Sequence, residues 1–287
     1  MITDIMVDRR AVEAIKAALQ EDIGAGDVTT LALVDPDVMA TGEILAREAC
    51  RVSGTTVAAA VMKSVEPGLM VEILVPDGQD VAQGGTILTI RGKAASILTA
   101  ERTALNFMQR MCGVATLTSQ FVEAVSEFKT LILDTRKTTP NLRVFEKHAV
   151  LCGGGMNHRF GLYDRVLMKD NHRKLWKGGD PGRLDLAVEV ARKAYPNLAV
   201  EVEVESIEEC KSALRAKPEW MMLDNMDCAT MRTCVDLCKG VSRTEASGGI
   251  TLEKAYAVAA TGVDAISRGC LTHSAGSIDL SLEWQVV

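Results

Sequence analysis

The sequence predicts an α/β protein in which an N-terminal α+β domain is followed by a series of βα units. Two observations predict this class. From residue 130 onward, short apolar runs recur and are separated by amphipathic or loop segments, which is the rhythm of parallel strands joined by helices. The first hundred or so residues instead show one amphipathic helix and then several strand-like stretches. A chain of 287 residues is long enough for one large domain or two, with buried cores.

The N-terminal region begins with an amphipathic helix. In "DRRAVEAIKAALQED" the apolar residues Val12, Ile15 and Leu19 recur at helical spacing, and Gly24 follows as a stop. Strand-like stretches come next and are separated by turn residues: "GEILAREA", "LMVEILVPDGQDV" and "GTILTIRG". This succession of a helix and several strands predicts an α+β domain.

A long apolar-periodic helix is expected from about Leu98 to Phe128, with a bend at Gly113. We expect the first domain to cover residues 1–111, and the C-terminal tail, residues 275–287, to pack with it. The second domain is expected to cover residues 112–274.

Six short apolar runs in the second domain predict parallel β-strands, at residues 131–134, 165–170, 199–204, 220–224, 242–247 and 264–267. Polar residues near the ends of the last four runs follow one another at intervals of 20 to 23 residues, which is close to the length of one βα unit. Parallel strands in such a series form either an open doubly wound sheet or a barrel.

The run "VEVEVES" (200–206) alternates valine with glutamate, so a strand here presents valine on one face and carboxylates on the other. Two interpretations are open. The run is an edge strand with a wet acidic face, or its acidic face points into a polar cavity and meets a cationic group. The neighbouring strands decide between them.

Polar, charged or glycine residues follow every predicted strand: "DTRKTTP", "KDNH", Glu203 to Glu205, "LDNM", "EASGG" and "SRGCLTHS". Ligand sites of α/β folds lie at the carboxyl ends of the strands. Six such strand ends in succession predict a functional site there. Glu203 belongs to this set, which favours the cavity interpretation.

The predicted site carries charges of both signs. Arg136, Lys137 and Lys169 follow the first two strands, whereas Glu203 and Asp224 end the third and fourth. A phosphorylated substrate bound to Mg²⁺ suits both halves, because Mg²⁺ prefers a few carboxylates together with substrate phosphates and water. The glycines of "SGG" and "RGC" allow backbone N–H groups to approach a phosphate. We infer such a substrate beside a second anionic one.

Long motifs extend across nearly the whole chain: "EDIGAGDVTT", "ERTALNFMQRMCGVATLT", "LDTRKTTPNLRVFEKHAVLCGGGMNHRFGLYDRVLMKDNH", "EVEVES", "MMLDNM", "EASGGIT" and "TGVDAISRGCLTHS". Together they resemble the motifs of one family, the nicotinate-nucleotide pyrophosphorylases (carboxylating), or quinolinate phosphoribosyltransferases. Asn141 stands where this family often has glycine, and His148 where tyrosine is common. The resemblance implies an N-terminal α/β sandwich domain and an open, TIM-like α/β barrel of the type II phosphoribosyltransferase kind.

The resemblance also implies residue roles. The residues it assigns to quinolinate are Arg102, reaching in from the partner subunit, Thr135, Arg136, His158, Arg159 and Lys169. Those it assigns to 5-phosphoribosyl 1-diphosphate are Lys137, Glu203, Asp224, Ser247, Gly248, Gly249, Gly269 and His273, although a structural role for His273 stays open. Lys169, Glu203 and Asp224 are the expected catalytic residues. Mg²⁺ is expected to be held mainly by the substrate diphosphate, near Glu203 and Asp224, with no organic cofactor.

The implied activity is a pentosyl transfer in NAD biosynthesis. Quinolinate and 5-phosphoribosyl 1-diphosphate give nicotinate mononucleotide, CO₂ and diphosphate, and the implied enzyme is a homodimer with shared sites. The net charge of −6 argues against a nucleic-acid partner. The sequence shows neither a signal-peptide pattern nor an apolar run of membrane-spanning length. Its eight cysteines form no C-x-x-C pair, which is typical of reduced, buried thiols. These features predict a cytoplasmic enzyme.

Three alternatives stay open from the residues. A relative within the same fold would act on another pyridine acid or on a molybdenum-linked substrate. A Schiff-base lyase would use Lys169 at a barrel strand end. A non-catalytic, carrier-like module would use the "PDGQDV" region, although that region presents no lysine at its turn.

Overall fold

The structure is a computed structural model that describes residues 5–176 and 179–286. Within these ranges the chain forms two compact units, and neither is one continuous segment. The first unit combines the described parts of residues 1–119, 137–155 and 270–287. The second combines residues 120–136 with the described parts of 156–269. The predicted domain limits at residues 111 and 274 stay a prediction.

The first unit begins with helix η1 (Ile5–Val7) and helix α1 (Arg9–Ile23). The Asp8 side chain accepts a hydrogen bond from the backbone N–H of Arg10 and so caps α1. Gly24 has a φ of +53° and ends the helix. The predicted amphipathic helix is therefore confirmed, and its buried face includes Ile15 and Leu19.

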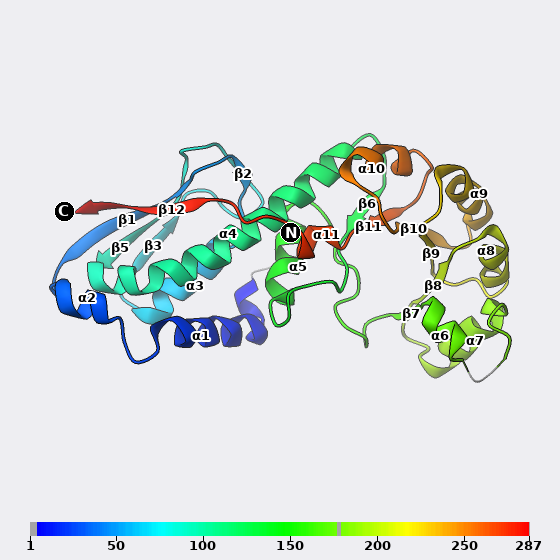
Figure 1. The fold of residues 1–287 in the computed structure, drawn as a ribbon, viewed down its shortest axis with the longest axis horizontal. Coiled ribbons are helices and arrows are strands. Elements are labelled where there is room, and N and C mark those ends of the chain that lie inside the picture. Colours follow the sequence, from blue (N-terminus) through cyan, green and yellow to red (C-terminus); the bar gives the residue numbers. More distant parts are fainter. Residues whose placement is uncertain (1–4, 177–178, 287) are drawn as a thin grey trace. The chain divides into compact units, whose positions relative to one another are not determined.

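The strands of the first unit form an antiparallel sheet in the order β12-β1-β5-β3 among the described residues. They are β1 (Met39–Ala46), β3 (Met70–Ile73), β5 (Thr86–Lys93) and β12 (Leu280–Val286). Two shorter strands, β2 (Cys50–Arg51) and β4 (Asp80–Val81), pair separately. Every second residue of β1 from Ala40 onward is buried, so one face of the sheet packs on helices such as α3 (Thr55–Val65) (Figure 1).

A continuous helix, α4, runs from Ala94 to Ala124 and passes through Gly113. A Cβ atom at Gly113 would overlap the carbonyl oxygen of Gly276. This glycine is therefore explained by the close approach of the segment that leads to β12. Helices α2 (Val28–Leu33), α5 (Arg143–Cys152) and α11 (Cys270–His273) complete the first unit.

The second unit contains a parallel sheet whose strands, in the part of the chain described, lie in the order β6-β11-β10-β9-β8-β7. They are β6 (Leu131–Leu133), β7 (Val166–Met168), β8 (Val200–Val204), β9 (Trp220–Asp224), β10 (Arg243–Ser247) and β11 (Ala265–Ser267). The first strand of the series pairs with the last, as in a barrel, and β6 and β7 form the two edges of the sheet. The predicted open α/β barrel is confirmed, and the doubly wound alternative is wrong.

Helices follow the strands and lie outside them (Figure 1). They are α6 (Asp170–Lys174), α7 (Leu184–Ala194), α8 (Ile207–Leu214), α9 (Cys228–Cys238) and α10 (Leu252–Ala259). Asp227 caps α9 and Ser206 caps α8 through side-chain hydrogen bonds to backbone N–H groups. Inside the barrel, Leu133, Trp220 and Ala265 form an apolar cluster with Leu131.

Strand β8 decides between the two interpretations of the run "VEVEVES". Every residue from Val200 to Val204 is buried, and the strand pairs with both β7 and β9. The edge-strand interpretation is therefore wrong. Glu201 contacts His158, and Glu203 contacts Lys169, so both glutamates meet cationic or proton-donating partners, whereas Glu205 lies beyond the strand and is exposed.

No helix in the described part of the chain is long and apolar enough to cross a membrane.

Candidate active site

Parallel pairing brings the polar residues of several strands to one end of the barrel. Asp224 at the end of β9 lies opposite Ser247 at the end of β10, and Ser267 at the end of β11 lies opposite Leu133 of β6. Glu203 lies opposite Met222, two residues before Asp224. Since all of these strands run in the same direction, the residues that follow them meet at the carboxyl end, where α/β enzymes bind ligands.

Carboxylates gather at the ends of β8 and β9. Glu203, Glu205 and Asp224 each offer an oxygen, and these oxygens lie within 4.8 Å of one another. Burial raises the pKa of Glu203, the charge of Lys169 lowers it, and the charge of Asp224 raises it. The net direction is upward. The group has the oxygen chemistry that suits a divalent cation bound to phosphate.

Lys169 lies beside this acidic group. It follows β7, its side chain is about half exposed, and its Nζ lies 3.5 Å from Oε2 of Glu203. The backbone N–H of Lys169 donates to Nδ1 of His172, which holds the first turn of α6. The ammonium group is therefore placed at the carboxyl end of the barrel and is available to an anionic ligand.

Guanidinium groups form the basic part of the same unit. Arg159 is buried, and its Nη1 donates to the carbonyl oxygen of Arg165 at 3.1 Å. Burial lowers the pKa of Arg159, and the charges of Arg136 and Arg165 lower it further. Like charges held close together are costly unless an anion joins them. Arg136 and Arg159 thus have the character of a site for a multiply charged anion, and the half-buried Thr135 precedes them in the chain.

His158 is held inside the barrel by two glutamates. Its Nε2 lies 2.9 Å from Oε2 of Glu201 and 3.4 Å from Oε2 of Glu245. Its Nδ1 accepts a hydrogen bond from the backbone N–H of Arg159 at 2.7 Å, so Nε2 carries the proton donated to Glu201. The backbone N–H of His158 donates to Asp134. Both ring nitrogens are thereby engaged by groups of the barrel itself.

Two members of this network are ionised to different extents. Burial raises the pKa of Glu201, but the hydrogen bond from His158 and the nearby charge of Arg165 outweigh it and lower the pKa. Burial and the charge of Glu201 raise the pKa of Glu245 to about 7, against the effect of His158. The Arg165 guanidinium lies 3.1 Å from Glu201. Glu201, Glu245 and Arg165 were not among the predicted site residues.

The loop after β10 has the backbone that a phosphate site needs. Gly248 has a φ of +113°, and a Cβ atom there would overlap the Asn225 side chain, so only glycine fits this position. A Cβ at Gly249 would meet no atom within 4 Å, and Gly249 is exposed. The backbone N–H groups of this loop can therefore be approached by a ligand.

Arg268 reaches this loop from the end of β11. Its Nη1 donates to the carbonyl oxygen of Gly248, and its Nε has no hydrogen-bond partner among the described residues. Arg268 was not among the predicted site residues, although it stands between Ser267 and the predicted site residue Gly269. Its position adds a cation beside the predicted phosphate loop.

Three predicted site residues belong to the first unit. Lys137 is exposed, and its carbonyl oxygen accepts a hydrogen bond from Thr272. His273 is exposed, with its Nδ1 2.6 Å from the Ser274 hydroxyl. Arg102 is exposed on α4. The roles assigned to these residues stay predictions.

A cavity of about 880 Å³ lies at the other end of the barrel, where β9 and β10 begin. Trp220, Arg243 and Asp264 line it. Arg165 and Arg243 lie 5.3 and 5.5 Å from the centre of the Trp220 ring, so the faces of this ring already have cationic neighbours. The predicted site residues do not line this cavity.

The fold and the site together define a class of protein. An open barrel of parallel strands with carboxylates, a lysine and a glycine loop at its carboxyl end, and with guanidinium groups in the same unit, is typical of an α/β-barrel enzyme of anionic substrates. Two family models match: the N-terminal domain of quinolinate phosphoribosyl transferase over residues 27–112, and its C-terminal domain over residues 114–283. The chain belongs to the quinolinate phosphoribosyl transferase family.

Known proteins agree with this assignment. The chain is 40% identical to the nicotinate-nucleotide pyrophosphorylase [carboxylating] of Mycobacterium leprae, over 99% of this chain and all of that protein. It is also 40% identical to a mitochondrial quinolinate phosphoribosyltransferase of Nicotiana tabacum, over 94% of this chain and 81% of that protein. Among solved structures, NadC from Streptococcus pyogenes matches with a TM-score of 0.91 and 38% identity, and 96% of each chain is covered.

Proposed function

We propose that the carboxyl end of this barrel carries out the reaction of the family. The chain transfers the phosphoribosyl group of 5-phosphoribosyl 1-diphosphate to quinolinate with decarboxylation, and nicotinate mononucleotide, CO₂ and diphosphate are the products. This is a step of NAD biosynthesis. The observation that carries the proposal is that one barrel unit holds both a cluster of guanidinium groups and, at the ends of β8 and β9, a cluster of carboxylates.

Quinolinate is a planar dianion, and guanidinium groups bind carboxylates through two parallel hydrogen bonds. Arg136 lies close enough to Arg159 for its charge to lower the pKa of Arg159. We assign them to the two quinolinate carboxylates, with Thr135 and Lys169 completing the subsite. Two contacts fix the position of Arg159: its Nη1 donates to the carbonyl oxygen of Arg165, and its backbone N–H donates to Nδ1 of His158. The two guanidinium groups favour a pyridine dicarboxylate over a monocarboxylate.

The phosphoribosyl substrate is assigned to the acidic group and the glycine loop. Glu203 and Asp224 would face the ribose hydroxyls and the Mg²⁺ that accompanies the diphosphate, because Mg²⁺ takes carboxylate oxygens together with phosphate and water. Ser247, Gly248, Gly249 and Gly269 would hold the 5-phosphate. Lys137 and His273 are assigned to the same substrate on the family resemblance.

The reaction needs little proton transfer by the protein. Departure of diphosphate leaves an electron-poor ribosyl carbon, which carboxylates such as Glu203 and Asp224 stabilise. The pyridine nitrogen attacks this carbon from the opposite face. The C–C bond to the adjacent carboxylate then breaks, the positive ring nitrogen stabilises the carbanion that departing CO₂ leaves on that carbon, and a proton from solvent takes the place of CO₂. The contributions of the chain are orientation of two anions and placement of charge.

We also propose a homodimer with shared sites. Val28, Leu31 and Leu33 on the short helix α2 have exposed fractions of 78 or 79%, and several large apolar side chains exposed on one short helix are typical of a protein–protein contact. Arg102 is exposed on α4 and is assigned to the quinolinate carboxylates of the partner's site. A cytoplasmic location is proposed because all eight cysteines are free, as expected in a reducing compartment.

The lyase alternative is less well supported. A Schiff-base lysine attacks as an uncharged amine, whereas the Lys169 ammonium is paired with Glu203 at 3.5 Å. Lys169 therefore already has an ion-pair partner in a group of carboxylates, an arrangement that suits a site for anions and divalent cations.

The experiment that tests the proposal is a direct assay of the purified chain with quinolinate, 5-phosphoribosyl 1-diphosphate and Mg²⁺. Nicotinate mononucleotide and CO₂ should form in equal amounts. Nicotinate in place of quinolinate should give little product, because it has one carboxylate. Turnover of nicotinate at the rate of quinolinate would contradict the assignment of two carboxylate-binding arginines.

A further inference from the structure

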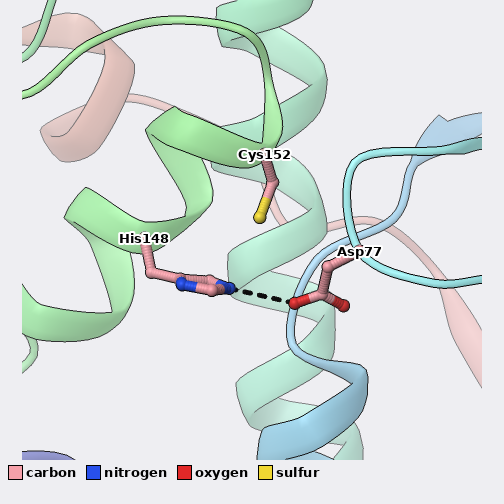
Figure 2. Close-up of side chains that lie close together, drawn as sticks. All are labelled: Asp77, His148 and Cys152. Atoms are coloured by element: carbon pink, nitrogen blue, oxygen red, sulfur yellow. Dashed lines mark hydrogen bonds and ion pairs between the residues drawn. The ribbon is translucent and has the colours of Figure 1, made fainter. Parts of the chain in front are cut away.

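Three side chains of different chemistry meet in the first unit, away from the residues assigned to the reaction. They are Asp77, His148 and Cys152 (Figure 2). The carboxylate, imidazole and thiol each offer one atom, and these atoms lie within 4.8 Å of one another. His148 and Cys152 are buried, and Asp77 is 11% exposed at its side chain. Nothing in the proposed reaction uses this group.

Two of these residues come from one helix face. His148 and Cys152 lie four residues apart on α5, so their side chains project in the same direction from successive turns. A histidine and a second ligand at this spacing are a common way for a helix to present two ligands to one metal ion. The sequence "HAVLC" therefore already has the spacing of a metal-binding pair.

Asp77 meets this pair from the loop between β3 and β4. Its Oδ2 lies 3.0 Å from Nε2 of His148. The same carboxylate accepts hydrogen bonds from the backbone N–H groups of Gly54 and Thr55 and from the Thr55 hydroxyl. These three donors fix the carboxylate at the start of α3. One oxygen is thus held in position toward the imidazole and the thiol.

We propose that Asp77, His148 and Cys152 bind a divalent transition-metal ion of the Zn²⁺ type. Carboxylate oxygen, imidazole nitrogen and thiolate sulfur are the ligands that Zn²⁺ takes in proteins. With neutral His148, ionised Asp77 and a Cys152 thiolate, the loaded group has no net charge, which suits its burial. Zn²⁺ takes four ligands, and the part of Asp77 that reaches solvent leaves access for water as the fourth.

The bound ion would act as a cross-link within the first unit. It would join α5 to the loop that precedes β4 and to the start of α3, which Asp77 caps. Because none of these three residues is assigned to the reaction, the proposed effect is on stability, and it does not depend on the proposed enzymatic reaction.

The test uses the full chain, stripped with a chelator and titrated with Co²⁺ as a spectroscopic probe and with Zn²⁺. A thiolate bound to Co²⁺ gives a charge-transfer absorption that carboxylates alone do not give, so binding at Glu203, Glu205 and Asp224 does not produce the signal. One equivalent of Co²⁺ should give this absorption in the wild-type chain. Zn²⁺ should abolish it by displacement and should raise the melting temperature.

Two variants locate the ion. Cys152→Ser should remove the charge-transfer absorption, and His148→Tyr should weaken Co²⁺ binding by at least about tenfold. Tyrosine is the residue that the family resemblance places at position 148, so this variant is expected to fold. Cys228→Ser, which changes a cysteine on α9 of the other unit, is the matched control and should keep the full signal.

Two results would overturn the proposal. One is a wild-type chain that shows no thiolate absorption with Co²⁺ and no change in melting temperature with Zn²⁺ or chelator. The other is an absorption that persists in both folded variants. If Cys152→Ser fails to fold, the wild-type and His148→Tyr measurements decide the question alone.

Discussion

Lys169 and Glu203 meet at the carboxyl end of the barrel, with Nζ and Oε2 3.5 Å apart. One follows β7 and the other lies on β8, and the two strands are direct neighbours. Lys169, which is assigned to quinolinate, therefore lies beside Glu203, which is assigned to 5-phosphoribosyl 1-diphosphate. This contact is the structural link between the two halves of the proposed site.

Replacing Lys169 should change both turnover and its pH dependence. The charge of Lys169 lowers the pKa of Glu203, so Lys169→Gln should raise that pKa further. If ionised Glu203 is required, the acidic limb of the kcat/KM profile moves to higher pH, and kcat falls by about 10²-fold. Lys174→Gln changes an exposed lysine nearby and should leave both unchanged. An unshifted acidic limb in Lys169→Gln would refute the coupling.

Ionisation of Glu245 should make the folded protein less stable as the pH rises. The pKa of Glu245 is raised from 4.5 to about 7, so the folded state retains a proton that the unfolded state has lost. The free energy of unfolding therefore falls as pH rises from about 4.5 to about 7. Glu245→Gln cannot ionise, so its stability relative to wild type should improve by about 1–3 kcal/mol between pH 5 and pH 8.

Denaturant unfolding at the two pH values measures this change. Glu253→Gln alters an exposed glutamate on α10 and serves as the control, with no such improvement. A relative stability of Glu245→Gln that worsens toward pH 8 would mean that Glu245 is ionised throughout this range in the folded protein.

The two glycines after Ser247 should respond differently to alanine. At Gly248 the positive φ and the overlap with Asn225 predict a loss of about 1–3 kcal/mol in the free energy of unfolding. At Gly249 the space is open, so Gly249→Ala should fold normally but should raise the KM for 5-phosphoribosyl 1-diphosphate, because the methyl group occupies the phosphate loop. Equal stability of the two variants would argue against this account of the loop.

Shared sites in a homodimer predict recovery of activity on mixing. Arg102→Ala and Lys169→Ala subunits should each be inactive as homodimers. A mixed dimer contains one site with both defects and one intact site, so activity should return to about half of the wild-type value per dimer formed. Verified mixed dimers without activity would exclude a contribution of Arg102 to the partner's site.

The elements could be predicted from the sequence because their patterns are local. The alternation of "VEVEV" and the Gly24 stop each depend on a few neighbouring residues, and both appear in the structure as expected. The long helix was also predicted, whereas the reason for its Gly113 was not, since that reason is the close approach of the distant residue Gly276.

The contacts of His158 with Glu201 and Glu245 inside the barrel could not be predicted in the same way. Glu245 contacts His158 only because β8, β9 and β10 pair in a particular register, and no local pattern fixes that register. The spacing of Glu201 and Glu203 on one face of β8 was the available signal, and it indicated that Glu201 also points inward. Likewise, His148 and Cys152 show helical spacing in the sequence, whereas Asp77 comes from a loop 71 residues earlier.

The most direct measurement of the central claim is a crystal structure of the chain with nicotinate mononucleotide. In this complex the pyridine carboxylate should lie against Arg136 or Arg159, the ribose hydroxyls should face Glu203 and Asp224, and the phosphate should lie in the loop from Ser247 to Gly249. A product bound in the cavity beside Trp220 and Arg243, at the opposite end of the strands, would contradict it.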